Sequence, residues 1–293
     1  MFGALFTKKS NQLKIYHPLT EKKRLINKRL ASLEGIYRKC KICPEPCGID
    51  RNNFKPKCRP SKHNTYFKES ILISEEAIIS PSYTVFFQGC NLNCIYCQAY
   101  NEIWGKHFAK EYKPAEMASW VNRAAKAQTF SFNGGEPFCH ILAALETILH
   151  LNREIPIVWK TNLYVSREVL DILQGIIDVY VIDFKASLAC SHYITGKHNY
   201  FEVIRTNFEY LVSSQKEALF IVRHLQLPGH FECCTKPILE WLRPFASVFY
   251  LSLPDYFPCH QALSDPNLNR LVSQEEREKA FVLAKNLGLR LVF

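Results

Sequence analysis

Residues 83–97 of the 293-residue chain read YTVFFQGCNLNCIYC, and this stretch decides the fold. Its first part is β-branched and aromatic, which predicts a buried strand that runs directly into a cysteine-rich loop. Five more apolar runs follow, and amphipathic helical stretches separate them, which is typical of repeated βα units on a parallel sheet. The six expected strands cover residues 83–88, 129–133, 155–161, 179–184, 219–225 and 247–252. Six βα units are fewer than the eight of a closed barrel, so an open partial barrel and a doubly wound sheet both fit the sequence. In either fold the active site is expected at the carboxyl ends of the strands.

The loop after the first strand spaces three thiols as C-x3-C-x2-C, at Cys90, Cys94 and Cys97. Three thiolates can hold three irons of a cubane iron–sulfur cluster and leave the fourth iron open for a ligand. The alternative is a structural zinc site, which would normally need a fourth protein ligand. The nearest histidine, His107, lies ten residues beyond the loop. The spacing therefore favours the cluster and leaves zinc open.

The remaining cysteines also indicate metal chemistry. No apolar run approaches the roughly 18 residues of a membrane span, and the opening residues are too short for a signal segment, so we expect a cytoplasmic protein whose thiols stay reduced. Four of the 12 cysteines lie within 19 residues, at Cys40, Cys43, Cys47 and Cys58. This group predicts a site for zinc or a second iron–sulfur cluster. The other five are expected to be mostly small apolar core residues: Cys139, Cys190, Cys233, Cys234 and Cys259.

Most of the net charge of +10 lies near the N-terminus, because residues 1–60 hold 15 Lys and Arg residues against 4 Asp and Glu residues. Apolar side chains gather on one side of a helix expected over residues 20–38, which favours a helix docked on the body. The basic residues Lys22, Lys23, Lys28 and Arg29 fall elsewhere on that helix. A basic arm can recruit RNA, but a solvated helix face is the simpler interpretation, since no nucleic-acid-binding module accompanies it.

Motifs in matching order along the chain resemble those of one enzyme family. The cysteine loop, with Tyr96 before its last cysteine, is similar to the signature of the radical S-adenosylmethionine (radical SAM) superfamily. Residues 133–137, Asn-Gly-Gly-Glu-Pro, follow the second strand and resemble that family's GGE motif, which holds the amino group of the methionine moiety. Two glycines let backbone approach a ligand closely, and a carboxylate suits an amine. The resemblance thus implies that Gly134, Gly135 and Glu136 bind S-adenosylmethionine.

Further motifs resemble relatives of the pyruvate formate-lyase activating enzyme. Asp183-Phe-Lys185 is similar to an Asp-Leu-Lys of those activases that helps to bind S-adenosylmethionine, whereas alone it would be a surface ion pair contributing under about 1 kcal/mol. His260 matches an activase histidine near the nucleoside, and the backbone around Tyr96 is expected to meet the adenine. The third strand ends in Lys160-Thr-Asn162, where activases often carry an acid-Thr-Asn-Gly run, so we expect Thr161 or Asn162 to reach the ribose.

The resemblance implies a fold, cofactors and partners. The fold is α/β, a partial (β/α)6 TIM-like barrel with an N-terminal helical, Cys-rich extension similar to that of uncharacterised activating-enzyme-like proteins. The cofactors are a [4Fe–4S] cluster and S-adenosylmethionine, with an electron donor of flavodoxin or ferredoxin type. The family reaction cleaves S-adenosylmethionine to a 5′-deoxyadenosyl radical, which abstracts hydrogen from a substrate, here a protein or peptide. The alternatives are modification of RNA and a non-catalytic metal or iron–sulfur scaffold, and no membrane partner is expected.

The chain divides into three expected parts. Residues 1–60 form the basic arm with its four-cysteine segment, residues 61–262 the barrel, and residues 263–293 a helix and strand that pack on it. Ser273 and Glu276 predict a capping box at the start of the last helix, and Gly288 ends it. Residues 289–293 are expected to form a terminal strand.

Overall fold

The computed structural model describes residues 17–73 and 76–292. Part of the expected arm, residues 1–16, and the last residue of the expected terminal strand lie outside them. The described chain contains one sheet of eight strands in the order β3-β1-β2-β4-β5-β6-β7-β8. Six neighbouring strands are parallel, and they are β2 (Ser82–Phe87), β4 (Thr129–Gly134), β5 (Ile157–Thr161), β6 (Val179–Asp183), β7 (Leu219–Arg223) and β8 (Phe249–Ser252). The expected partial (β/α)6 barrel is confirmed.

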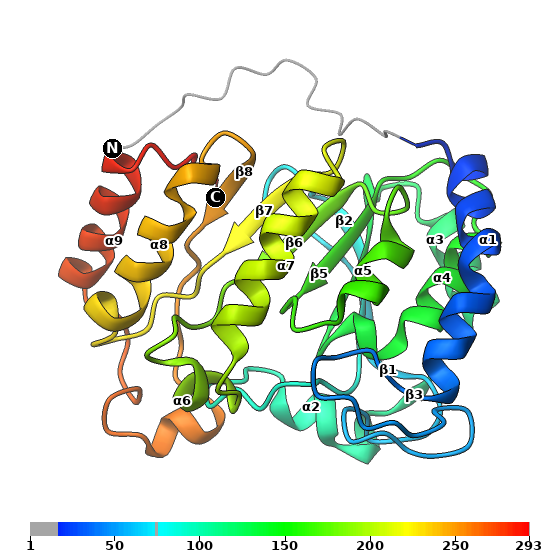
Figure 1. The fold of residues 1–293 in the computed structure, drawn as a ribbon, viewed down its shortest axis with the longest axis horizontal. Helices are drawn as coiled ribbons and strands as arrows, with labels where there is room; N and C mark the ends of the chain where they lie inside the picture. The colour runs from blue at the N-terminus through cyan, green and yellow to red at the C-terminus, as the bar shows by residue number, and fades with distance from the viewer. Residues whose placement is uncertain (1–16, 74–75, 293) are drawn as a thin grey trace.

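These strands form because each is rich in β-branched and aromatic residues and has both faces largely covered. All five residues of β5 are buried, as a parallel sheet with helices on its outer side requires. Trp159 of β5 packs against Phe132 and Phe138 with ring centroids 5.3 and 5.2 Å apart. Figure 1 shows the helices along the outside of the sheet, with α8 and α9 at one end and α1, α3 and α4 at the other.

Helices connect the parallel strands. Their bounds are α2 (Tyr100–Trp104), α3 (Pro114–Arg123), α4 (Ile141–His150), α5 (Arg167–Leu173), α6 (Ser191–Thr195), α7 (Tyr200–Ser214), α8 (Lys236–Leu242) and α9 (Gln274–Asn286). Short 3-10 turns add Lys106–Phe108, Pro137–His140, Arg243–Phe245 and His260–Ser264, and a π-helical turn covers Phe231–Thr235. The capping box is present, since the Ser273 hydroxyl accepts from the Glu276 backbone and the Glu276 carboxylate accepts from the Ser273 backbone. The expected terminal strand is reduced to one bridge, between Leu251 and Leu291.

Two antiparallel strands extend the sheet at the β2 edge, and the sequence did not reveal them. The first, β1 (Thr65–Leu72), pairs with β2, and the short β3 (Lys110–Glu111) pairs with β1. Much of β1 is only half-buried, and Lys68 and Glu69 interrupt its apolar character. An edge strand with one solvated face lacks the continuous apolar run that marked the other six.

The N-terminal helix α1 (Leu19–Arg38) docks on the body, against α4 and α5. It buries Ile26, Leu33, Ile36 and Tyr37, as its apolar side predicted. The expectation of a solvated basic face is wrong for Lys22, which is buried in an ion pair with Asp178. Arg29 also turns inward, because its guanidinium donates to the carbonyl of Ile172 at 3.0 Å.

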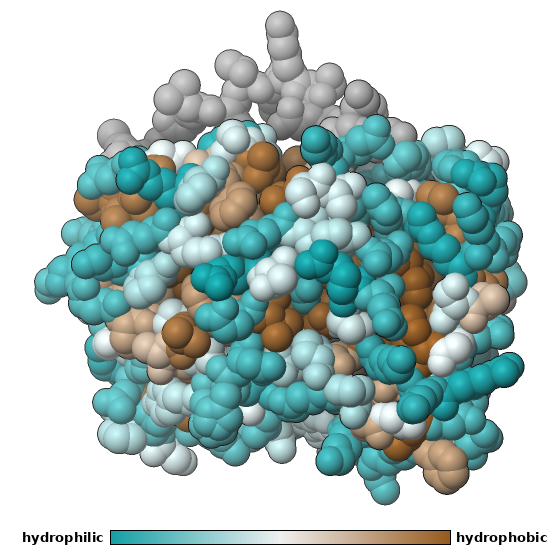
Figure 2. Space-filling model, viewed as in Figure 1, coloured by the Kyte–Doolittle hydropathy of each residue, from teal (hydrophilic) through white to brown (hydrophobic). Residues whose placement is uncertain are grey.

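The surface in Figure 2 is mainly hydrophilic, with small apolar areas scattered between polar side chains. Within the described residues, no helix combines the length and apolar character that crossing a membrane requires.

Candidate active site

The three-cysteine loop, residues 89–97, leaves the carboxyl end of β2 at the edge of the sheet where α2 and α6 lie (Figure 1). Backbone hydrogen bonds hold it to α6, since Asn93 N donates to Thr195 O at 3.0 Å and Ile95 N donates to Ile194 O at 3.1 Å. The Gly89 N–H donates to Ile103 O at 3.0 Å. Neighbouring helices therefore fix the loop at its start and in its middle.

All three loop thiols border one cavity of about 310 Å³. Burial raises the pKa of Cys94 to about 12, and burial also raises those of Cys90 and Cys97. Thiols whose pKa is raised in this way give up their protons when a metal supplies the compensating positive charge. The donor set thus fits an iron-bearing group, whose irons would be held by these three sulfurs.

The loop sulfurs do not converge on one point. Among residues 17–73 and 76–292, one group of three or more Cys, His or acidic residues has its ligand atoms within 4.8 Å of one another. That group is elsewhere, at Cys190, His230 and Cys233. A single zinc ion draws its thiolates closely together, whereas a cubane cluster takes each thiolate on a different iron. The placement of the loop thiols leaves both a cluster and zinc open.

The Gly-Gly-Glu motif brings backbone against the loop. A Cβ added to Gly135 would lie 1.7 Å from Gly89 O, and one on Gly134, which has a φ of +118°, would lie 2.2 Å from Phe87 N. Any larger residue would push the end of β4 away from the loop. Both glycines border the cavity.

The carboxylate of Glu136 does not border the cavity, and it organises the tip of β5. It is fully buried and accepts hydrogen bonds from Phe138 N at 3.2 Å, the Thr161 hydroxyl at 2.9 Å and Asn162 N at 2.8 Å. Burial raises its pKa to about 7, although the three hydrogen bonds oppose the shift. Asn162 in turn donates to Cys90 Sγ at 3.6 Å, so Glu136 supports the cluster loop through a neighbour.

Charged side chains line the cavity beyond β5. Asp183 accepts from Lys185 and from Arg223, each at 2.8 Å. Burial acts to raise the pKa of Asp183, but the charges of Arg223 and Lys185 hold it well below its ordinary value. Lys160 lies 3.9 Å from Glu76, which also pairs with Arg223 at 3.8 Å. The part of Arg223 and Glu76 was not predicted from the sequence, because only the fold brings Arg223 to Asp183 and Glu76 to Arg223.

Tyr96 and His260, which were also expected to bind S-adenosylmethionine, lie in different places relative to the cavity. Tyr96 borders the cavity, and its carbonyl accepts from the Cys259 thiol at 3.0 Å. His260 does not border the cavity, since its ring stacks on Tyr100 with centroids 3.7 Å apart. The residues brought together at the cavity are thus Cys90, Cys94, Cys97, Tyr96, Gly134, Gly135, Thr161, Asn162, Asp183 and Lys185.

The four N-terminal cysteines border a second cavity, of about 370 Å³, which also reaches Cys90. A fifth thiol, Cys139, is buried as expected, and it also borders this cavity and hydrogen-bonds to Cys58. The buried Arg51 donates to the sulfurs of Cys40 and Cys58, both at 3.4 Å, and to Cys139 O at 2.6 Å. The Cys139 hydrogen bond and the Arg51 charge lower the pKa of Cys58 to about 5 against burial, and this favours the thiolate that binds metal.

Comparison with known proteins now gives the family. The model of the radical SAM superfamily matches residues 84–242. The chain belongs to the radical SAM superfamily. An uncharacterised protein of Methanocaldococcus jannaschii is 32% identical over 282 residues, which cover 93% of this chain and 82% of the relative.

Two solved structures resemble the fold of this radical SAM protein. A domain of a pyruvate-formate lyase-activating enzyme from Bacteroides vulgatus is 18% identical with a TM-score of 0.39, over 55% of this chain and 95% of that one. Streptococcus suis SuiB, bound to its precursor peptide SuiA, is 14% identical with a TM-score of 0.47, over 69% of this chain and 46% of that one.

Proposed function

We propose that this chain binds a [4Fe–4S] cluster through Cys90, Cys94 and Cys97 and S-adenosylmethionine in the adjoining cavity, in order to abstract hydrogen from a protein or peptide. The observation that carries the proposal is the set of three half-buried thiols on one loop, at the border of a cavity that charged side chains line at the carboxyl ends of the strands. When bound, the reduced cluster supplies the electron that cleaves S-adenosylmethionine to methionine and a 5′-deoxyadenosyl radical.

The cavity offers suitable contacts for each part of S-adenosylmethionine. The backbone of Gly134 and Gly135 would meet the methionine end, where Lys185 supplies positive charge for a carboxylate. Thr161 and Asn162 would reach the ribose, and the backbone at Tyr96 the adenine. We assign Glu136 a positioning role rather than direct contact, because its carboxylate is already used at the tip of β5.

Asp183 fixes the positive charges around this cavity. Its two oxygens hold Lys185 and Arg223 in place, so the cations stay oriented without reorganisation when a ligand enters. His260 is a further candidate for contact with the nucleoside, on the basis of the family resemblance. Its ring would have to leave Tyr100 to serve in that way.

An activating-enzyme-like role on a polypeptide is supported by a neighbouring cavity of about 410 Å³. It shares Arg223, Pro254 and Asp255 with the first cavity, which gives a substrate a route to the reactive centre. Gln226 and Arg277 border it; Gln226 donates to Glu276 O and Arg277 pairs with Asp255, and the remaining N–H groups of both would hydrogen-bond backbone carbonyl groups of a peptide. The electron donor, of flavodoxin or ferredoxin type, and the cytoplasmic location stay predictions.

We also propose that Cys40, Cys43, Cys47 and Cys58 hold zinc or a second iron–sulfur cluster within a segment, residues 1–60, that precedes a barrel of residues 61–262 and a C-terminal part of residues 263–293. Their shared cavity and the acidic thiol of Cys58 support the metal. Modification of RNA is less well supported, because the cations Lys22 and Arg29 of α1 are engaged with the body.

Anaerobic reconstitution with iron and sulfide tests the proposal. After reduction by dithionite, we expect the wild type to convert S-adenosylmethionine to 5′-deoxyadenosine, measured by chromatography. Cys94→Ser should abolish this product, whereas the matched variant Cys47→Ser should keep the barrel cluster and lose metal from the N-terminal site. A reconstituted wild type that binds iron but forms no 5′-deoxyadenosine would contradict the enzyme and favour a non-catalytic scaffold.

A further inference from the structure

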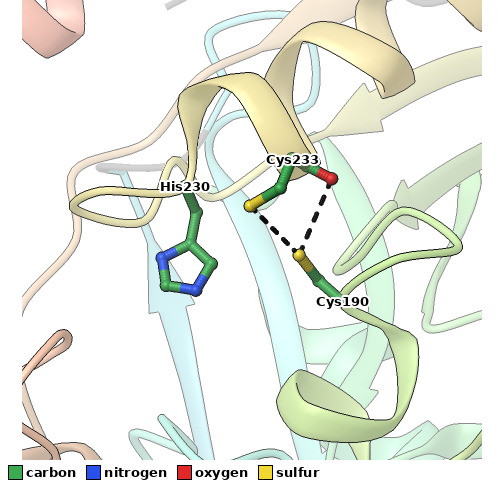
Figure 3. A group of neighbouring side chains, drawn as sticks. All are labelled: Cys190, His230 and Cys233. Carbon is green, nitrogen blue, oxygen red and sulfur yellow. Dashed lines mark hydrogen bonds between the residues drawn. The ribbon is translucent and has the colours of Figure 1, made fainter.

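A second ligand cluster lies away from the cavity, in the loops after β6 and β7. Cys190 directly precedes α6, His230 precedes the π-helical turn Phe231–Thr235, and Cys233 lies within that turn. Figure 3 shows the three side chains gathered between α6 and the turn. Sequence analysis expected Cys190 and Cys233 to be mostly core residues, but the fold brings them together across 43 positions.

The distances suit one metal ion. One ligand atom from each of the three residues lies within 4.8 Å of the others, and the two sulfurs are 3.3 Å apart. Two thiolates on a tetrahedral zinc ion, with bonds of about 2.3 Å, lie roughly 3.8 Å apart. Small side-chain rotations would therefore bring all three atoms to bonding distance.

The imidazole of His230 has the hydrogen bond that a metal ligand needs. Its Nδ1 lies 2.8 Å from Pro228 O, and a carbonyl can only accept, so Nδ1 carries the proton. Nε2 therefore keeps its lone pair for a metal, as in metal sites where the other ring nitrogen donates to a carbonyl. The ring also stacks on Tyr193 with an interplanar angle of 7°, which limits its orientation.

We propose that Cys190, His230 and Cys233 form a structural zinc site that joins α6 to the connection between β7 and α8. Sulfur and imidazole ligands in this ratio select zinc among the abundant divalent ions, because magnesium and calcium take oxygen ligands. The thiol of the buried Cys234 hydrogen-bonds to Cys190 but lies outside this group of three, so it would supply a fourth ligand only after its side chain moves closer. Zinc binding converts the cysteine thiols to thiolates, and the thiol protons pass to solvent.

The site would support the cluster loop indirectly. Helix α6 begins after Cys190, and its carbonyls at Ile194 and Thr195 accept hydrogen bonds from the backbone of that loop. A zinc ion at Cys190 would thus fix the helix that holds residues 89–97. None of the three ligands borders the cavity of the loop thiols, so the zinc ion would take no direct part in catalysis.

Zinc content measured on the full-length, cluster-reconstituted protein tests the site. We expect the wild type to bind one equivalent of zinc more than Cys190→Ser or Cys233→Ser, while the matched variant Cys259→Ser keeps that equivalent. Cobalt substitution should give thiolate-to-cobalt charge-transfer absorption that weakens in both site variants. Equal zinc in the wild type and the two site variants would overturn the proposal.

A second measurement uses the wild type alone and does not depend on the folding of a variant. With zinc bound, alkylation of Cys233 by iodoacetamide, followed by mass spectrometry, should be slowed at least tenfold and restored by a zinc chelator. The same rate before and after chelation, or a Cys190–Cys233 disulfide in reduced protein, would contradict a metal site. If the zinc site fails this test, the proposed function can still be tested separately by the formation of 5′-deoxyadenosine.

Discussion

The cluster loop and the N-terminal cysteine segment both present thiols to cavities, but the fold fixes them in different ways. The cluster loop, residues 89–97, leaves a central strand and is bonded through its backbone to α6 and to Ile103. The N-terminal thiols lie in turns without regular strands, and one buried cation, Arg51, lies among them. The difference teaches that strands and helices of the barrel supply the geometry of the first site, whereas turns and the side-chain contacts of Arg51 supply that of the second.

The largest expected effect comes from breaking the backbone contact at the barrel site. In Gly135→Ala the new methyl group would overlap Gly89 O, at 1.7 Å, and we expect a loss of at least about 3 kcal/mol in the free energy of unfolding, with loss of the cluster. Urea unfolding and the iron content measure both effects. The matched control is Gly35→Ala in α1, where an added Cβ meets nothing within 4 Å and should stabilise by roughly 0.5–1 kcal/mol. A Gly135→Ala protein as stable as the wild type would show that the loop is not fixed by this contact.

The contrast between the two sites also explains what could be predicted from the sequence. The six parallel strands were found because each is a local apolar run, and the cluster thiols because one loop carries all three. The strand β1 was missed because Lys68 and Glu69 interrupt its pattern.

Contacts between distant residues gave no sequence signal. The ion pair of Lys22 with Asp178 joins residues 156 positions apart, and a lysine on a helix is ordinarily expected in solvent. Cys139 next to Cys58 and Cys190 next to Cys233 follow in the same way from the packing of loops, which no spacing rule predicts. Such residues could be recognised only after the fold had placed their partners.

The N-terminal site should be sensitive to its central cation. Arg51→Met removes the donor to Cys139 O and to two sulfurs, and an unsatisfied buried carbonyl alone costs about 1–3 kcal/mol. We expect a total loss of about 2–3 kcal/mol and weaker retention of the N-terminal metal, measured by urea unfolding and metal content. The control Arg51→Lys keeps the charge without the forked donors and should recover part of the loss. If Arg51→Met also removes the barrel cluster, the two sites are not independent.

A pH series sharpens the comparison at the barrel site, where Glu136 is fully buried. Its pKa is raised to about 7 from 4.5, so the folded chain binds this proton more tightly than the unfolded chain does. The contribution of Glu136 to the free energy of unfolding is therefore complete below about pH 4.5. It is lost as the pH rises through 7, by roughly 2–3 kcal/mol. Urea unfolding of the metal-free protein should show this decrease, and Glu136→Gln should remove it. An identical pH profile in the variant would mean that another group titrates.

The smallest effect is expected where the N-terminal segment touches the barrel through exposed charges. Lys197, just after α6, pairs with Glu45, and their side chains are 22% and 52% exposed. Solvent screens such a pair, so Lys197→Ala should cost less than about 1 kcal/mol, and less again in high salt. A double-mutant cycle with Glu45→Gln, followed by urea unfolding, isolates the pairwise energy. A coupling above about 2 kcal/mol would show that the barrel holds the N-terminal segment as firmly as it holds the cluster loop. Contacts within the N-terminal segment would then not be what fixes its thiols.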